Sequence, residues 1–203
     1  MDRNDERTLT KNENCPAVEN PLTTYARLLR VQIELADELE HLADALPDNF
    51  DQQRCRELAE TIPSLFDVTL SLTQEFLHPT LLRRAQGQNF SPETVSRLKS
   101  ERLMDQGYAI EVNGLLLKLA GRRDCCDMNA AGYLLRGFFE NWRRACAFEL
   151  EYVMPLATKH LTRDDLAGMA ALLERQRMVT APACTSTRLA FKSPPLHRAP
   201  RDP

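Results

Sequence analysis

The chain has 203 residues, of which 43% are hydrophobic and 27% are charged. These proportions are ordinary for a globular protein, and the length predicts one domain with a sizeable hydrophobic core. A formal net charge of −3 at pH 7 provides no broad basic surface, so no nucleic-acid partner is expected.

The N-terminal segment, residues 1–20, is polar and lacks the apolar stretch of a secretory signal. No apolar run in the chain reaches the length of a membrane span. We therefore expect a cytoplasmic protein with no membrane partner, whose six cysteines are thiols. Cys125 and Cys126 are adjacent and do not have the CxxC spacing of redox motifs, although a redox-responsive role for this pair remains an alternative.

From Pro21 onward, apolar residues recur at intervals of three and four, which predicts helices. The first predicted helix runs from about Pro21 to Leu46, with an inner stripe of Tyr25, Leu28, Gln32, Leu35, Leu39, Leu42 and Leu46. A short helical piece then leads to Pro63, which is predicted to begin the second long helix because proline suits a first turn. The inner positions of that helix, which runs toward Pro79, are Leu65, Thr69, Leu72 and Phe76.

The third predicted helix begins after Ser91-Pro92, a capping serine followed by a first-turn proline, and ends at Gly121. Its stripe is Val95, Leu98, Arg102, Asp105, Ala109, Val112, Leu116 and Leu119. A fourth helix is predicted from about Asn129 to Lys159, with Phe138, Trp142, Ala145, Glu149, Tyr152 and Leu156 facing inward. Thr162 to Asp165 reads as a capping box that opens a last helix reaching about Arg175.

Four long amphipathic helices predict an all-α fold, an up-down-up-down four-helix bundle with a short additional C-terminal helix. The predicted boundaries are a disordered segment over residues 1–20, the bundle over residues 21–176, and a disordered, proline-rich and basic tail over residues 177–203.

Two of these helices end alike, with Glu75-Phe76-Leu77-His78-Pro79 in the second and Glu151-Tyr152-Val153-Met154-Pro155 in the fourth. Each is a long amphipathic run that closes on an apolar cluster and a proline. This pattern, together with the third-helix segment Ser100–Ala109, resembles the hemerythrin-like, HHE cation-binding family over residues 21–175. The resemblance implies a four-helix bundle that would hold a di-iron centre.

The positions that correspond to the family's iron ligands carry other residues. The resemblance places its two His-x-x-x-Glu motifs and its His-x-x-x-His motif on Thr69 and Thr73, on Ala145 and Glu149, and on Arg102 and Gln106. The first-helix histidine falls near Leu28 or Gln32, so only Glu149 is retained. A centre of this kind uses about five imidazoles, whereas the chain has four histidines. We therefore expect no di-iron cofactor.

Arg102, Asp105 and Glu149 fall on inward stripes, where an unpaired charge costs several kcal/mol. We predict that the Arg102 guanidinium occupies the space of the metal, held below roughly 3 Å by Glu149. Further contacts are expected from a buried polar network of Asp105, Gln32, Thr69, Thr73 and Gln106, with Ala145 at a former ligand position. The alternative is that Arg102 extends outward into water.

His41 and His78 are predicted to lie off the inner stripe or at a helix end. The Glu38/His41 and Glu75/His78 pairs have the Glu-x-x-His spacing of carboxylate di-metal sites, but a solvated position is the favoured interpretation. No catalytic triad or phosphate-binding loop is present, so no enzymatic activity is predicted. The sequence favours an interaction or regulatory protein that binds a protein partner or itself. The alternative is a sensor that binds a different metal or a small ligand in the bundle core.

Overall fold

The computed structural model describes residues 20–85, 90–121 and 127–180, with side chains as far as residue 177. All regular structure in these segments is helical, as predicted, and the same segments contain no strand. No helix among them is both long and apolar enough to cross a membrane. Residues 1–19 of the predicted disordered segment 1–20, the Cys125/Cys126 pair and the tail after residue 180 lie outside the described residues. Asn20 is described and caps the first helix, where its Oδ1 accepts the Leu22 N–H at 3.0 Å.

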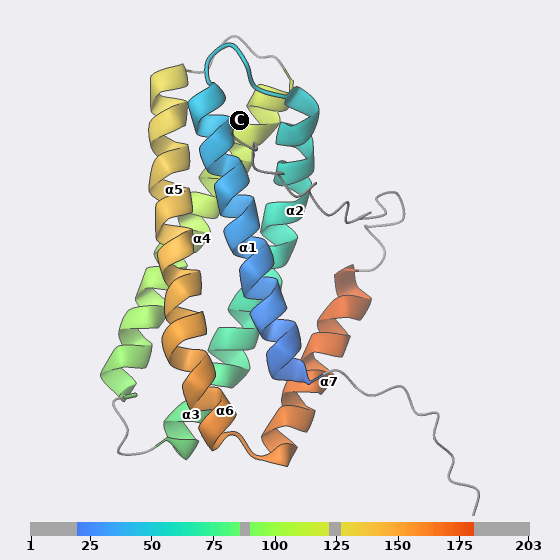
Figure 1. Cartoon of the computed structure of the whole chain (residues 1–203), viewed down its shortest axis with the longest axis vertical. Helices are drawn as coiled ribbons and strands as arrows, with labels where there is room; N and C mark the ends of the chain where they lie inside the picture. The colour runs from blue at the N-terminus through green and yellow to red at the C-terminus, as the bar shows by residue number, and fades with distance from the viewer. Residues whose placement is uncertain (1–19, 86–89, 122–126, 181–203) are drawn as a thin grey trace, which may run out of the picture.

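Four long helices run alongside one another (Figure 1): α1 (Pro21–Ala45), α2 (Gln52–Ser71), α4 (Pro92–Ala120) and α5 (Met128–Phe148). The main packing partner of α1 is α5, and that of α2 is α4, while α1 also contacts α2 and α4 also contacts α5. These four contacts form a closed ring around one core. Successive long helices run in opposite directions along the molecule (Figure 1).

Shorter elements extend two of these helices. A π-helical segment, η1 (Leu72–Leu77), links α2 to α3 (His78–Arg84). A second one, η2 (Glu149–Val153), links α5 to α6 (Met154–His160). The last helix, α7 (Arg163–Thr180), lies obliquely beside the lower ends of α1 and α2 (Figure 1).

Two of the predicted helix starts, those of α4 and α7, are capped by side chains. Ser91 Oγ accepts the backbone N–H of Thr94 at 3.3 Å, and Gly121 follows the last residue of α4, as predicted. At α7, the Asp165 carboxylate accepts the Thr162 N–H at 2.9 Å, and the Thr162 hydroxyl accepts the Asp165 N–H at 3.2 Å. This reciprocal pair is a capping box, which satisfies two amides at the helix start.

The predicted break before Pro63 is wrong, because α2 continues through this proline. Proline inside a helix removes a hydrogen bond and crowds the carbonyl four residues earlier, at a cost of about 3 kcal/mol. Cys55, Leu58, Ile62 and Phe66 are all buried on one continuous face of α2. Burial of these side chains offsets the cost, and one long helix replaces the predicted pair.

The last helix is longer than predicted, since α7 extends to Thr180 and not only to about Arg175. Met169 and Leu172 are buried and anchor α7 against the bundle. At Gly168 an added Cβ would lie 3.0 Å from Cε2 of the Phe76 ring, so a side chain here would push the two elements apart. The helix is therefore part of the packed domain.

The α1 stripe differs slightly from the prediction. Tyr25, Leu29 and Leu39 are fully buried, whereas Leu28 is half-buried. The helix ends at Ala45, so the half-buried Leu46 lies just outside it. Ion pairs join the outer edges of α1 and α5, with Arg143 at 2.6 Å from Asp37.

Candidate functional site

The two π-helical segments each end two residues before a proline, Pro79 or Pro155. A proline has no N–H, and its ring crowds the carbonyl of the residue four positions earlier. The π segments relieve this by lengthening the hydrogen-bond spacing to five residues, so that the His78 amide bonds to the Thr73 carbonyl. The Met154 amide bonds to the Glu149 carbonyl in the same way. Both helices therefore continue past their prolines.

A five-residue spacing moves the buried face of each helix forward by one position. Phe76, predicted to face inward, is half-buried, and Leu77 is fully buried instead. On the other helix, Tyr152 is half-buried and Val153 is fully buried. The same displacement turns His78 into the interior, where it is 2% exposed. The prediction that His78 lies off the inner stripe or at a helix end is wrong, because it took Pro79 as the end of the helix, whereas the helix continues through this proline.

His78 and Glu149 form a buried pair at the centre of the site. The His78 Nε2 atom lies 3.0 Å from Glu149 Oε1, and the Glu149 side chain is 1% exposed. A carboxylate can only accept a hydrogen bond, so Nε2 carries the hydrogen and donates it. The His78 and Phe90 rings pack in a T-shaped arrangement, with ring centroids 5.9 Å apart. This pair links the helix that contains Pro79 to the helix that contains Pro155.

Arg102 lies beside this pair, and its side chain is 10% exposed. Its guanidinium is 3.9 Å from Glu149 Oε1 and 4.0 Å from Asp105 Oδ2. Both distances exceed the roughly 3 Å predicted for a charge-assisted hydrogen bond. His78 explains the difference, because it already bonds to the same Glu149 oxygen. Arg102 is thus surrounded by carboxylates without a hydrogen bond to any described residue.

The second oxygen of Glu149 and the nearby Tyr25 hydroxyl are both buried. Neither Glu149 Oε2 nor the Tyr25 hydroxyl has a hydrogen bond of normal geometry to the described residues. Burial, followed by the charge of nearby Glu149, raises the pKa of Tyr25 well above its usual value. Burial also raises the pKa of Asp105, although Arg102 opposes this effect. Several charged and polar groups in this part of the interior therefore lack hydrogen bonds of normal geometry to the described residues.

Gln32, Thr69 and Cys146 form a separate polar cluster. The Gln32 amide donates to the Thr69 hydroxyl at 2.5 Å, and the Cys146 thiol donates to the Gln32 carbonyl oxygen at 3.1 Å. Burial raises the pKa of Cys146 to about 12, so this cysteine remains a thiol. The cluster is satisfied within itself.

The remaining predicted network members do not bond to Arg102. The Thr73 hydroxyl donates to the Thr69 carbonyl of its own helix at 2.9 Å. Gln106 is half-buried and has no side-chain bond to a described residue. Ala145 lines the groove described next. The network predicted around Arg102 is thus divided: Asp105 and Glu149 approach its guanidinium, and the other residues lie in different contacts or in none.

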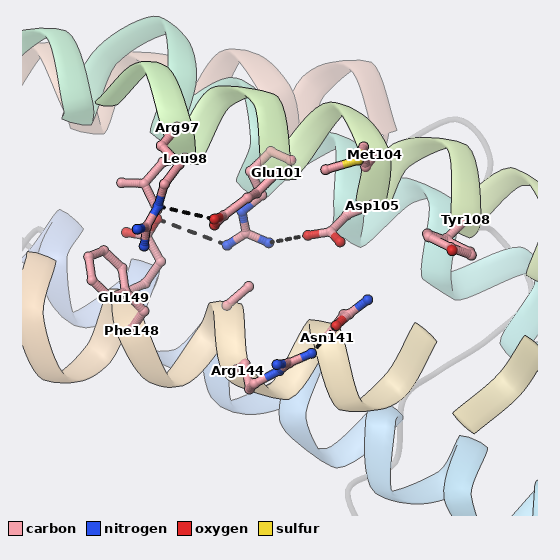
Figure 2. Close-up of a pocket in the computed structure, with 12 residues that line it drawn as sticks. Arg97, Leu98, Glu101, Met104, Asp105, Tyr108, Asn141, Arg144, Phe148 and Glu149 are labelled. Atoms are coloured by element: carbon pink, nitrogen blue, oxygen red, sulfur yellow. Dashed lines mark hydrogen bonds and ion pairs between the residues drawn. The ribbon is translucent and has the colours of Figure 1, made fainter. Parts of the chain in front are cut away.

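A groove with a volume of about 480 Å³ lies between α4 and α5, which we term the α4–α5 groove. Figure 2 shows Glu101, Asp105 and Tyr108 on its α4 wall, with Asn141 and Arg144 on the α5 wall opposite. The lining residues are Arg97, Leu98, Glu101, Arg102, Met104, Asp105, Tyr108, Asn141, Arg144, Ala145, Phe148 and Glu149. The two buried charged groups, Arg102 and Glu149, therefore reach an open space.

The residues of this site do not fit a di-iron centre. Iron sites of the hemerythrin type need several neutral imidazoles around one point. Here His78 is bonded to Glu149, and the guanidinium of Arg102 lies 3.9 Å from that carboxylate, where it would repel a metal cation. Within the described residues, no group of three or more His, Cys, Asp and Glu side chains could hold a metal ion.

The other candidate metal pairs are separated by the fold. His41 is exposed, and Glu38 is instead paired with Arg54 of α2. Glu75 is exposed while His78 is buried, so the two do not face one point.

Comparisons of the chain with protein-family models, with curated protein sequences and with solved structures found no match.

Proposed function

We propose that this chain is a non-enzymatic interaction protein, with an up-down-up-down four-helix bundle of hemerythrin-like architecture and no di-iron centre. The closed ring of α1, α2, α4 and α5 supports this architecture. The contacts of Arg102 with Glu149 and Asp105 support a metal-free interior, because the guanidinium supplies positive charge between the carboxylates. The proposal includes a cytoplasmic location and no nucleic-acid partner.

The outer face of α4 is the observation that carries the interaction role. Leu103, Ile110 and Leu117 are 55%, 69% and 54% exposed, respectively. They are spaced at intervals of seven residues, which places them along one side of the helix, as in a coiled-coil seam. Gly107 and Gly114 lie between them, and an added Cβ at either would meet nothing within 4 Å. We term this surface the α4 seam.

The partner that this seam fits best is the α4 seam of a second copy of the chain. Glu111 and Lys118 flank the same edge of the seam, seven residues apart, and neither has an ion pair with a described residue. If two copies cross antiparallel near Gly114, each Glu111 can face the Lys118 of the other copy. The two glycines allow close approach of the backbones, and Ile110 packs against Leu117 across the two-fold axis.

The test is the mass of the full chain in solution, measured by sedimentation equilibrium over a range of concentrations. We expect a species of twice the 23.1 kDa chain mass. The Ile110→Glu variant should be monomeric, because a charge would be buried at the seam. Tyr133→Glu, a control at a position that is 83% exposed on α5, should leave the dimer intact.

A charge exchange tests the partner more sharply. Glu111→Lys should weaken the dimer, since two lysines then face each other, and adding Lys118→Glu should restore it. A wild-type chain that is monomeric at every concentration would contradict self-association and leave a different protein as the occupant of the seam. A dimer that survives Ile110→Glu would place the interface elsewhere.

The rival function is a sensor that binds a different metal or a small molecule in the core, through Glu149, Asp105 and Gln106. Elemental analysis of the purified protein separates the two proposals. A stoichiometric metal would contradict the metal-free interior, and it should then be lost in Glu149→Gln. We expect less than stoichiometric metal in both proteins, because the Arg102 guanidinium opposes a cation at this point.

A further inference from the structure

The α4–α5 groove is lined by two buried groups of opposite charge, Arg102 and Glu149, whose hydrogen-bonding capacity is only partly used. Arg102 has five N–H donors, and none bonds to a described residue, although its side chain is only 10% exposed. Glu149 Oε2 is buried and has no hydrogen bond of normal geometry to these residues, although the Tyr25 hydroxyl lies near the Glu149 carboxylate. Buried polar groups in folded proteins almost always have partners, so these two indicate where a ligand would bind.

The two groups lie close together. The Arg102 guanidinium is 3.9 Å from Glu149 Oε1, which is near enough for attraction and too far for a hydrogen bond. A ligand that satisfies both must present an acceptor to the arginine and a donor to the carboxylate at adjacent positions. An α-amino acid does so, since its carboxylate and its ammonium group are joined through a single carbon.

Arg144 and Asp105 extend this pattern toward the groove opening. Arg144 is exposed on the α5 wall, and its positive charge acts on Asp105 across the groove. The Asp105 side chain is itself only 13% exposed. The groove therefore has a second cation for a ligand carboxylate and a second anion for a ligand ammonium. Arginine is well suited to the first task, because its planar group can donate two parallel hydrogen bonds to a carboxylate.

The remaining walls are apolar. Leu98, Met104, Tyr108 and Phe148 line the groove beside the charged groups. A volume of about 480 Å³ is at the lower end of the range for small-molecule pockets and is ample for one amino acid. Apolar walls around a few convergent polar groups are typical of ligand sites. They favour an amino acid with an apolar or aromatic side chain over one with a second charge.

We propose that the α4–α5 groove binds a small zwitterion of the α-amino acid class. Its carboxylate is held by Arg102 and Arg144, its ammonium group by Glu149 and Asp105, and its apolar side chain by the groove walls. The ligand would complete the hydrogen bonds that the interior leaves open. This site lies on the α5-facing side of α4 and does not require self-association through the α4 seam.

The test is calorimetric titration of the full chain with each of the standard L-amino acids in turn. At least one amino acid with an apolar or aromatic side chain should bind, with one molecule per chain. The matching amine, which lacks the carboxylate, and the matching acid, which lacks the ammonium, should each bind at least tenfold more weakly. If no amino acid gives a saturable signal, or if the amine or acid binds as well as the zwitterion, the proposal is wrong.

Two variants test which residue binds the carboxylate of the ligand and which binds its ammonium group. Arg144→Met, at an exposed position, should weaken amino acid binding at least tenfold and leave weak binding of the amine unchanged. Glu149→Gln should weaken amino acid binding and leave binding of the acid unchanged, with circular dichroism to establish that the variant is folded. Arg136→Met, an exposed position on the same helix outside the groove, serves as the control and should bind like the wild type. Equal binding by Arg144→Met and the wild type would contradict the assigned carboxylate site.

Discussion

Two levels of the bundle interior, one around Trp142 of α5 and one around Glu149 at the start of η2, are built in different ways. Around Trp142 the interior is aromatic, with the ring centroids of Phe138 and Phe66 at 5.2 Å and 6.3 Å from the indole. Around Glu149 it is charged, with His78 and Arg102 as neighbours. Aromatic burial depends on area and tolerates small shifts, whereas the charged level depends on specific atoms at specific distances. The first level can stabilise the fold, and the second can provide a binding site.

The largest expected effect is at the aromatic level. Trp142→Ala should lower the free energy of unfolding by about 3–5 kcal/mol, because it removes the largest buried side chain and leaves a cavity. Chemical denaturation monitored by circular dichroism measures this change. Tyr133→Ala, an exposed aromatic residue on the same helix, should change the stability by less than about 0.5 kcal/mol. A small effect at Trp142 would show that the charged level, and not the aromatic one, holds the bundle together.

The predictions from the sequence agree with the structure in the regular helices and fail at the charged level. In α4 the pattern of apolar residues placed Leu98, Ala109, Val112 and Leu116 on the buried face, and all four are buried. In these regular helices, a period of 3.6 residues determines which side chains face inward. The all-helical fold and the capping box at Thr162 followed from similarly local rules.

The centre of the site could not be predicted by those rules. The two prolines were visible in the sequence, but they were interpreted as helix ends. In the structure, the helices continue through them by widening one turn, and this brings His78 into the interior. A proline shortly after an apolar run inside a long helix is the signal that was available for this shift. The 3.9 Å distance from Arg102 to Glu149 depends on the competing His78 contact, which no single helix pattern contains.

The displaced face leads to a second, smaller prediction. Leu77→Ala should lower the free energy of unfolding by about 3 kcal/mol, because Leu77, the last residue of η1, is fully buried. The matched control is Leu82→Ala, the same truncation at a half-buried position of α3, which should cost less than half as much. Urea denaturation of both variants measures the difference. Equal losses would indicate that the helix keeps a regular period through this region.

The smallest expected effect concerns the start of α7, where a capping box and an ion pair meet at one carboxylate. Although burial opposes it, the Thr162 amide and the Arg84 guanidinium lower the pKa of Asp165 from its ordinary 3.8 to about 2. A pKa lowered by folding means that the carboxylate stabilises the protein above its ordinary pKa and loses this contribution as the pH falls toward 2. Asp165→Ala should therefore cost about 1 kcal/mol near neutral pH, in line with the loss of a helix cap. Asp164→Ala, at the exposed neighbouring position, is the control and should cost less.

The pH dependence distinguishes a charged cap from simple packing. The difference in free energy of unfolding between the wild type and Asp165→Ala should be constant above about pH 5 and should shrink as the pH falls from about 4 toward 2. Thermal denaturation at a series of pH values measures it, with Asp164→Ala expected to show a smaller change. A difference that persists unchanged at the lowest pH would mean that the Asp165 side chain acts through its contacts alone, and that the charge shared with Arg84 at 3.0 Å adds nothing. The end of the bundle would then resemble the aromatic level more than the charged one, because both would be stabilised by contacts that do not depend on ionisation.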